Sequence, residues 1–190
     1  MRRKLPTLII GLSIVAGFFN SAFATRFITS HKIKAPGFFF RTDSISADSI
    51  INFAESLIGV RYRSATSDPL QGFDCSGFVS YVFKKFNFNV PRSSGDFINI
   101  GVKVSLEDAL PGDIIIFTSP KKHSHRIGHV AIVYSNDSDG LKFIHSTSGK
   151  EHGVTITAMD DTYKRRFVQV VRLLKQNDVS KTPAVVVAAI

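Results

Sequence analysis

The most regular apolar pattern in the chain has helical spacing and begins at residue 75. Its members recur at i, i+3, i+4, i+7, i+8 and i+11, and they are Cys75, Phe78, Val79, Val82, Phe83 and Phe86. Lys84 and Lys85 fall off this stripe, which predicts an amphipathic helix buried on one side. Asp74 stands just before the stripe and is a favoured N-cap, so we expect Cys75 at the first helical position, facing the body of the domain.

A second stretch of helical spacing precedes this one. Its apolar members are Ile50, Ile51, Phe53, Ala54, Leu57 and Ile58. It begins at Ser46, and Gly59 stands where such a helix would end. A polar, turn-rich loop over 61–72 leads from there to the cysteine helix, which is followed by a short amphipathic stretch that ends near residue 100.

The pattern changes to strand-like runs after Pro111-Gly112-Asp113. The runs cover 114–117, 129–134, 141–145, 154–158 and 167–174. The turns at 136–140 and 148–153 are short and polar, as antiparallel neighbours require. Helices first and strands afterwards predict an α+β domain, with N-terminal helices packed on an antiparallel sheet of about five strands.

The first 24 residues have the layout of a secretory signal peptide. Basic residues precede an apolar run over 8–19, and Ala22-Phe23-Ala24 has small residues at the spacing that a signal peptidase reads. The run is short for a membrane span, and no cysteine follows it to carry a lipid anchor. We therefore expect cleavage after Ala24 and export to the periplasm or cell envelope, with a retained signal anchor as the alternative.

About 166 residues remain after cleavage, enough for one domain with a sizeable core. We expect an extended arm over 25–45, a single folded domain over 46–175 and a loosely held tail over 176–190. The arm contains Phe38-Phe39-Phe40, which we expect to pack on the domain surface or to mark a partner contact. The protein is expected to be a monomer.

The formal charge of +9 falls to +6 when the three basic residues of the signal peptide are removed. Basic exported proteins tend to meet anionic surfaces, so an anionic surface of the cell envelope is an expected partner. The lysines and arginines are scattered, and no recognition-helix pattern appears among them. Nucleic acid is therefore not an expected partner.

Cys75 is the only cysteine, so no intramolecular disulfide can form in an oxidising compartment. A lone cysteine on an apolar stripe can simply be a small buried hydrophobe. The start of a helix, however, favours the thiolate, and the pKa of such cysteines lies below the free value of about 8.5. We therefore expect a depressed pKa at Cys75 and a nucleophilic role.

Two histidines can supply the base that a cysteine nucleophile needs. His129 begins one strand and His145 ends the next, so the two side chains can be neighbours in a hairpin. His129 would take the thiol proton and His145 would hold its imidazole in one tautomer. A zinc site at His123, His125 and His129 is the alternative, but basic residues interleave these histidines and no carboxylate accompanies them.

Taken in order, several segments resemble the motifs of the NlpC/P60 cell-wall peptidases. They are Asp74-Cys75-Ser76-Gly77-Phe78-Val79, Pro111-Gly112-Asp113, Gly128-His129-Val130-Ala131-Ile132 and Ile144-His145. The resemblance spans roughly 46–174, and it is specific because independent motifs recur in the same order. It implies a papain-like α+β fold, a Cys-His-His arrangement and hydrolysis of peptide bonds in the stem peptides of bacterial peptidoglycan. No cofactor and no metal are expected.

The resemblance also implies roles for individual residues. Cys75 matches the nucleophile, His129 the base and His145 the orienting residue. Tyr62 matches the tyrosine that family members place beside the nucleophile, and the Arg92-Ser93 pair matches a segment bordering the cleft. The residues that flank the nucleophile in the matched motif, Asp74 and Ser76, complete the expected substrate-binding set.

The sequence therefore predicts an exported cysteine peptidase of peptidoglycan stem peptides. The expected bond is the one between γ-D-glutamate and diaminopimelate, with the amide of Cys75 and a neighbouring donor such as Tyr62 stabilising the oxyanion. Cleavage of the D-alanyl–diaminopimelate cross-link is the alternative within this class. From another class, the domain could be a non-catalytic wall-binding module.

Overall fold

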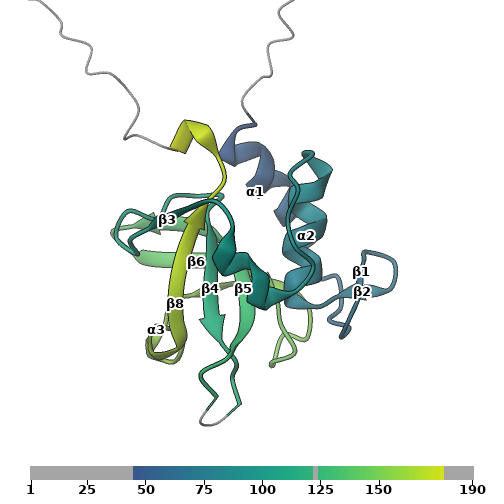
Figure 1. Cartoon of the computed structure of the whole chain (residues 1–190). Helices are drawn as coiled ribbons and strands as arrows, with labels where there is room; N and C mark the ends of the chain where they lie inside the picture. Colours follow the sequence, from purple (N-terminus) through teal and green to yellow (C-terminus); the bar gives the residue numbers. More distant parts are fainter. Residues whose placement is uncertain (1–44, 122–123, 178–190) are drawn as a thin grey trace, which may run out of the picture. The chain divides into compact units, whose positions relative to one another are not determined.

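The computed structural model describes residues 45–121 and 124–177, which form an α+β fold with a mostly antiparallel sheet (Figure 1). The expected fold class is confirmed. The predicted signal peptide, nearly all of the arm over 25–45 and nearly all of the tail over 176–190 lie outside the described residues, so these remain predictions. Among the described residues, no helix combines the length and apolar character needed to cross a membrane.

The helical elements lie mainly in the first half of the described chain. They are α1 (Ala47–Glu55), α2 (Cys75–Lys85), the 3-10 helix η1 (Ser94–Asn99), α3 (Asp161–Arg166) and the 3-10 helix η2 (Lys175–Asn177). Helix α1 begins at the N-cap Ser46, whose side chain accepts from the amide of Ser49. It ends at Glu55 instead of near Gly59. The residues from 56 to 59 form turns, and Gly59 itself has φ +86°.

The main sheet has six strands in the order β3-β8-β4-β5-β6-β7. They are β3 (Val102–Val104), β4 (Ile114–Thr118), β5 (Ile127–Asp137), β6 (Gly140–Ser146), β7 (Val154–Ala158) and β8 (Phe167–Arg172). Two short strands, β1 (Ser67–Asp68) and β2 (Gly72–Phe73), form a separate hairpin just before α2. The sheet has one strand more than expected, because β3 is only three residues long and mostly exposed, so its sequence carries little strand pattern.

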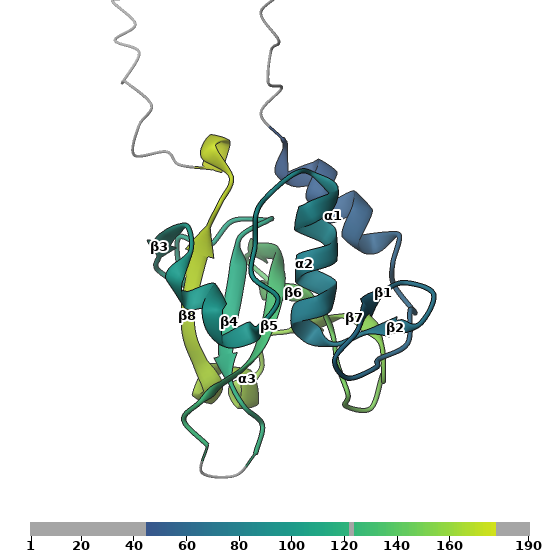
Figure 2. The same cartoon turned by 45° about the vertical axis from the view of Figure 1, so that its right-hand side comes forward.

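Helix α2 follows its sequence pattern closely. Phe78, Val79, Val82 and Phe83 are fully buried, whereas Lys84 and Lys85 are exposed. Burial of each such side chain contributes about 1.5–3 kcal/mol, so the stripe alone fixes which side of the helix meets the sheet. Figures 1 and 2 show α2 beside the central strands, with its start near β5, and α1 next to α2.

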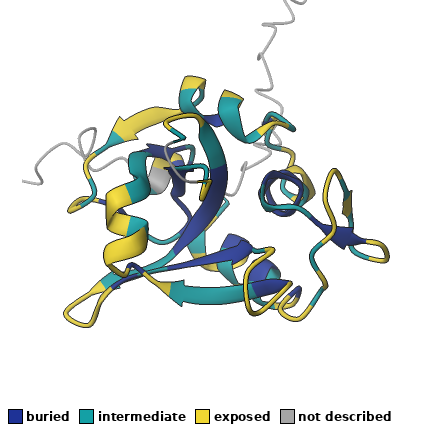
Figure 3. Cartoon of the chain, turned by 90° about the horizontal axis from the view of Figure 1, so that it is seen from below, coloured by how far each residue is buried: buried dark blue, intermediate teal, exposed yellow. Residues whose placement is uncertain are grey.

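Apolar side chains form a core on each face of the sheet. One core joins α1, α2 and η1 to alternate sheet positions such as Ile114, Ile132 and Ile144. The other uses the intervening positions, among them Phe117 and Phe143, and Tyr163 of α3 packs against it. Figure 3 shows buried positions along the strands and α2, and exposed positions in the loops. The start of α2 is thereby held against β5 in the interior of the sheet.

Candidate active site

Cys75 is the first residue of α2, as the sequence predicts. The Asp74 side chain caps the helix by accepting from the amide of Gly77 at 2.6 Å. Gly77 is required here, because a β-carbon at this position would lie 2.0 Å from the carbonyl oxygen of Thr66. The thiol points toward β5, where its sulfur lies 4.0 Å from the carbonyl oxygen of Gly128. The helix start therefore brings the sulfur to the residue that precedes His129.

The two predicted histidines form a buried pair. His129 Nε2 lies 2.8 Å from His145 Nδ1, and His145 Nε2 lies 2.9 Å from the hydroxyl of Thr157. The register Ile132↔Ile144 places both rings on one face of the sheet. If His129 carries its proton on Nε2, it donates to His145, which in turn donates to Thr157. Nδ1 of His129 is then left as an acceptor for a thiol proton.

Burial keeps the residues of this pair uncharged. It lowers the pKa of His129 well below the usual 6.5, and the nearby His145 and Arg166 lower that pKa further. Burial also lowers the pKa of His145 to about 4. A neutral imidazole at neutral pH is the form that a general base requires.

Burial raises the pKa of the Cys75 thiol above its usual value, an effect larger than the opposing contacts with backbone amides. The sequence-based expectation of a depressed pKa is therefore wrong for the resting site. The helix start does favour the thiolate, but the loss of water around the sulfur outweighs it. The directions of the two pKa shifts thus favour a neutral thiol and a neutral imidazole in this pocket.

We expect the thiolate absorbance of the protein to be nearly absent at neutral pH and to rise only at a higher pH than that of a free cysteine, because the thiol pKa is raised. The measurement is an ultraviolet titration of the difference between wild type and a variant without the thiol, because the tyrosines also absorb when they ionise and Cys75 is the single cysteine. Cys75→Ser provides the baseline. A thiolate signal at neutral pH would show that an ion pair between thiolate and imidazolium exists before substrate binds.

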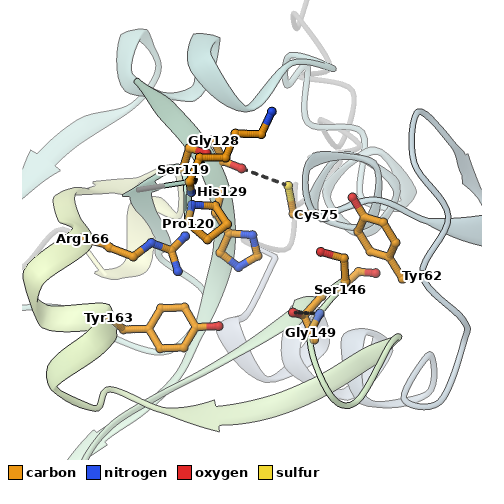
Figure 4. A pocket seen from close by; sticks show the side chains of 13 residues that line it. Tyr62, Cys75, Ser119, Pro120, Gly128, His129, Ser146, Gly149, Tyr163 and Arg166 are labelled. Carbon is orange, nitrogen blue, oxygen red and sulfur yellow. Dashed lines mark hydrogen bonds between the residues drawn. The ribbon is translucent and has the colours of Figure 1, made fainter. Parts of the chain in front are cut away.

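A pocket of about 470 Å³ opens in front of the sulfur (Figure 4). Its lining residues are Tyr62, Cys75, Ser119, Pro120, Lys121, Gly128, His129, Ser146, Thr147, Ser148, Gly149, Tyr163 and Arg166. Figure 4 shows Tyr62 on one side of Cys75, with His129, Tyr163 and Arg166 on the other. Burial raises the pKa of Tyr62 and the nearby Cys75 raises it further, so its phenol stays protonated and can donate to an oxyanion.

The other predicted substrate-binding residues gather at the start of α2, away from this pocket. Arg92 makes a two-pronged contact with Asp74, at 2.9 and 2.7 Å, and donates to the hydroxyl of Ser76 at 3.0 Å. Asp74, Ser76, Arg92 and Ser93 line a separate hollow of about 560 Å³ together with Ser64, Ala65, Ser94 and Asp96. The structure thus brings Tyr62 to the nucleophile and places these four in a neighbouring polar hollow.

Sequence reasoning missed Thr157, Tyr163 and Arg166. Two of them lie on α3, a six-residue helix that has no buried residue and hence no apolar stripe. A signal was nevertheless available, because Asp160 and Asp161 open the segment and Lys164-Arg165-Arg166 closes it. Acids at the start and bases at the end are typical of a short capped helix.

Within 45–121 and 124–177, no group of three or more histidine, cysteine or acidic side chains could hold a metal ion. His123, one member of the alternative zinc site, lies outside these residues. His129 itself bonds to His145, as described above.

Comparison with known proteins gives matches to one family. The NlpC/P60 family model matches residues 59–172. The chain is 36% identical over 103 residues to the gamma-DL-glutamyl hydrolase of Bacillus subtilis (strain 168), covering 50% of this chain and 25% of that protein. It is 32% identical over 121 residues to the murein DD-endopeptidase MepS/murein LD-carboxypeptidase of Escherichia coli (strain K12), covering 63% of this chain and 58% of that protein.

A solved structure matches the fold as well. An NlpC/P60 family protein from Bacillus cereus ATCC 10987 superposes with a TM-score of 0.59 at 32% identity, over 68% of this chain and 40% of that one. The present chain spans a quarter of the Bacillus subtilis relative and about three fifths of the Escherichia coli relative.

Proposed function

The chain belongs to the NlpC/P60 family, and from that premise we propose that it is a cysteine peptidase that hydrolyses stem peptides of bacterial peptidoglycan. The observation that carries the proposal is one constellation, in which Cys75 at the tip of α2 shares a pocket with His129, and His129 bonds to His145. A nucleophile, a base and an orienting group are the parts that acyl transfer requires.

The reaction follows from this geometry. As the sulfur of Cys75 attacks the carbonyl carbon, His129 takes the thiol proton, and the backbone N–H of Cys75 with the phenol of Tyr62 stabilises the oxyanion. The carbon–nitrogen bond then breaks, and His129 gives its proton to the leaving amine. A water, deprotonated by His129, hydrolyses the thioester and returns the free thiol and a carboxylic acid.

The bond that we propose is the one between γ-D-glutamate and diaminopimelate. The name of the Bacillus subtilis relative, a glutamyl hydrolase, supports this choice, whereas the name of the Escherichia coli relative supports the cross-link between stems as the second candidate. The proposal includes export through the predicted signal peptide and contact of the basic mature chain with an anionic envelope surface.

We expect purified muropeptides digested with the wild-type protein to yield a free disaccharide-dipeptide, identified by mass. Cys75→Ala should yield no product, because the proposed mechanism forms its thioester on the sulfur of Cys75. Uncross-linked monomers with intact stems would instead show cleavage of the D-alanyl cross-link. Absence of any product with wild type, together with retention on purified sacculi, would favour a non-catalytic wall-binding module.

A further inference from the structure

The pocket in front of Cys75 is cationic. Lys121 and Arg166 both line it, and none of the 13 lining residues is an aspartate or a glutamate. In Figure 4 the guanidinium of Arg166 lies on the side of His129, across the pocket from Tyr62. An uncompensated positive charge in a pocket favours a substrate group of negative charge.

Arg166 is held in place from within the protein. Its Nε and Nη2 donate to the carbonyl oxygen of Thr118 at 3.0 and 2.7 Å, and its guanidinium carbon lies 5.2 Å from the centre of the Tyr163 ring. A guanidinium carries five N–H donors, so the two bonds to Thr118 leave capacity for a ligand. The side chain is half-buried and pre-positioned, which lowers the entropy lost when it binds.

No carboxylate of the described chain pairs with Arg166. The ion pairs found there join Arg92 to Asp74, Lys164 to Asp161 and Arg172 to Asp113. Asp160 is the acid whose charge reaches Arg166, and its side chain already caps α3 by accepting from the amide of Tyr163 at 2.9 Å. An arginine fork matches a carboxylate in shape and charge, which makes that group its natural ligand.

The position of Arg166 indicates which part of a substrate it meets. His129 must reach the nitrogen that leaves, so the leaving residue lies on the His129 side of Cys75. Arg166 is near enough to His129 for its charge to affect the pKa of that imidazole. Arg166 therefore faces the leaving residue, and Tyr62 lies across from it, near the acyl part (Figure 4).

We propose that Arg166 is a specificity-determining residue that binds a free carboxylate of the leaving residue, so that the enzyme selects stems whose leaving residue carries one. The inference rests on the proposed function. In a tripeptide that ends in diaminopimelate, two carboxylates qualify: the terminal one beside the leaving nitrogen and the one at the far end of the side chain. Lysine, which lacks the second, can offer only the first.

The test uses three synthetic tripeptides, L-alanyl-γ-D-glutamyl-diaminopimelate with both leaving-residue carboxylates free, with only the terminal one amidated, and with only the side-chain one amidated. We expect one of the two amidations to lower wild-type kcat/KM about 10- to 100-fold, the effect of losing a charge-assisted contact. Arg166→Gln should lose a similar factor on the free peptide and be insensitive to that same amidation. The amidation with this behaviour identifies the carboxylate that is bound.

Arg165→Gln is the matched control, since it removes the same charge from the exposed neighbouring residue, and it should behave as wild type. The inference would be overturned if Arg166→Gln lowered kcat/KM relative to wild type by the same factor on all three peptides. It would also be overturned if neither amidation lowered kcat/KM of the wild type. If Arg166→Gln does not fold, the kcat/KM values of the wild type on the three peptides still show whether a carboxylate of the leaving residue is recognised. If wild type cleaves none of the peptides, the proposed function fails first and the inference falls with it.

Discussion

Replacement of His129 by alanine should reduce kcat/KM by at least about 10³-fold, the largest loss expected among variants that keep Cys75. The burial that raises the thiol pKa makes the enzyme dependent on a base at the moment of attack. Among the described residues that line the pocket, His129 is the only histidine, so without it the proposed mechanism lacks both its base and its proton donor for the leaving amine. The measurement is steady-state cleavage of a defined stem peptide, together with thermal unfolding to confirm that the variant is folded.

His145→Asn should keep part of the activity, with a loss of roughly 10- to 100-fold, because an amide oxygen can still accept from Nε2 of His129 and hold its tautomer. His125→Ala, which changes an exposed histidine of the loop before β5, is the matched control and should behave as wild type. Equal and total losses in the two site variants, with both folded, would show that the roles of base and orienting residue are assigned wrongly. A fully active His129→Ala would refute the mechanism.

The parts of the site that could be predicted from sequence are those set by local pattern. Asp74 caps α2 and Cys75 begins it because capping and periodicity act within a few residues. That His129 and His145 are neighbours could be predicted because one hairpin joins β5 and β6. Their common face depends on a register shift between Val133 and Ser135, which the sequence does not predict. In each case, the relevant partners are close in sequence or joined by one hairpin.

The parts that could not be predicted depend on the packed structure. The thiol pKa depends on how fully the sulfur is desolvated by residues from β5, which periodicity within α2 cannot report. Arg166 reaches the pocket only because the carbonyl of Thr118, 48 positions earlier, holds its guanidinium. Long-range side-chain contacts of this kind leave no periodic mark on the sequence.

The Pro111-Gly112-Asp113 motif is a further example. Its sequence predicts where a strand begins, but it does not predict the buried contacts that its aspartate makes. Asp113 is fully buried and accepts from Arg172 at 2.9 and 2.7 Å and from the amide of Leu110 at 2.9 Å. Arg172 is only 8% exposed and also donates to the carbonyl oxygen of Asp108 at 2.8 Å. The pair joins the start of β4 to the end of β8.

Asp113→Ala should therefore lower the free energy of unfolding by about 3–5 kcal/mol, because it removes the buried carboxylate that accepts hydrogen bonds from the guanidinium of Arg172. The measurement is equilibrium denaturation with urea. This loss is larger than the net contribution of the pair, since desolvation of the two groups offsets much of their attraction. A double variant, Asp113→Val with Arg172→Met, should consequently be more stable than Asp113→Ala.

Asp161→Ala supplies the matched comparison, because it breaks the exposed contact with Lys164 at 3.7 Å and should leave stability nearly unchanged. Similar small effects at positions 113 and 161 would show that Arg172 finds water or another acceptor when Asp113 is removed. A double variant less stable than Asp113→Ala would mean that the pair itself, with its hydrogen bonds to the backbone, stabilises the junction of β4 and β8 beyond what apolar packing supplies. Either result would contradict the account of the motif as a buried charge that needs its partner.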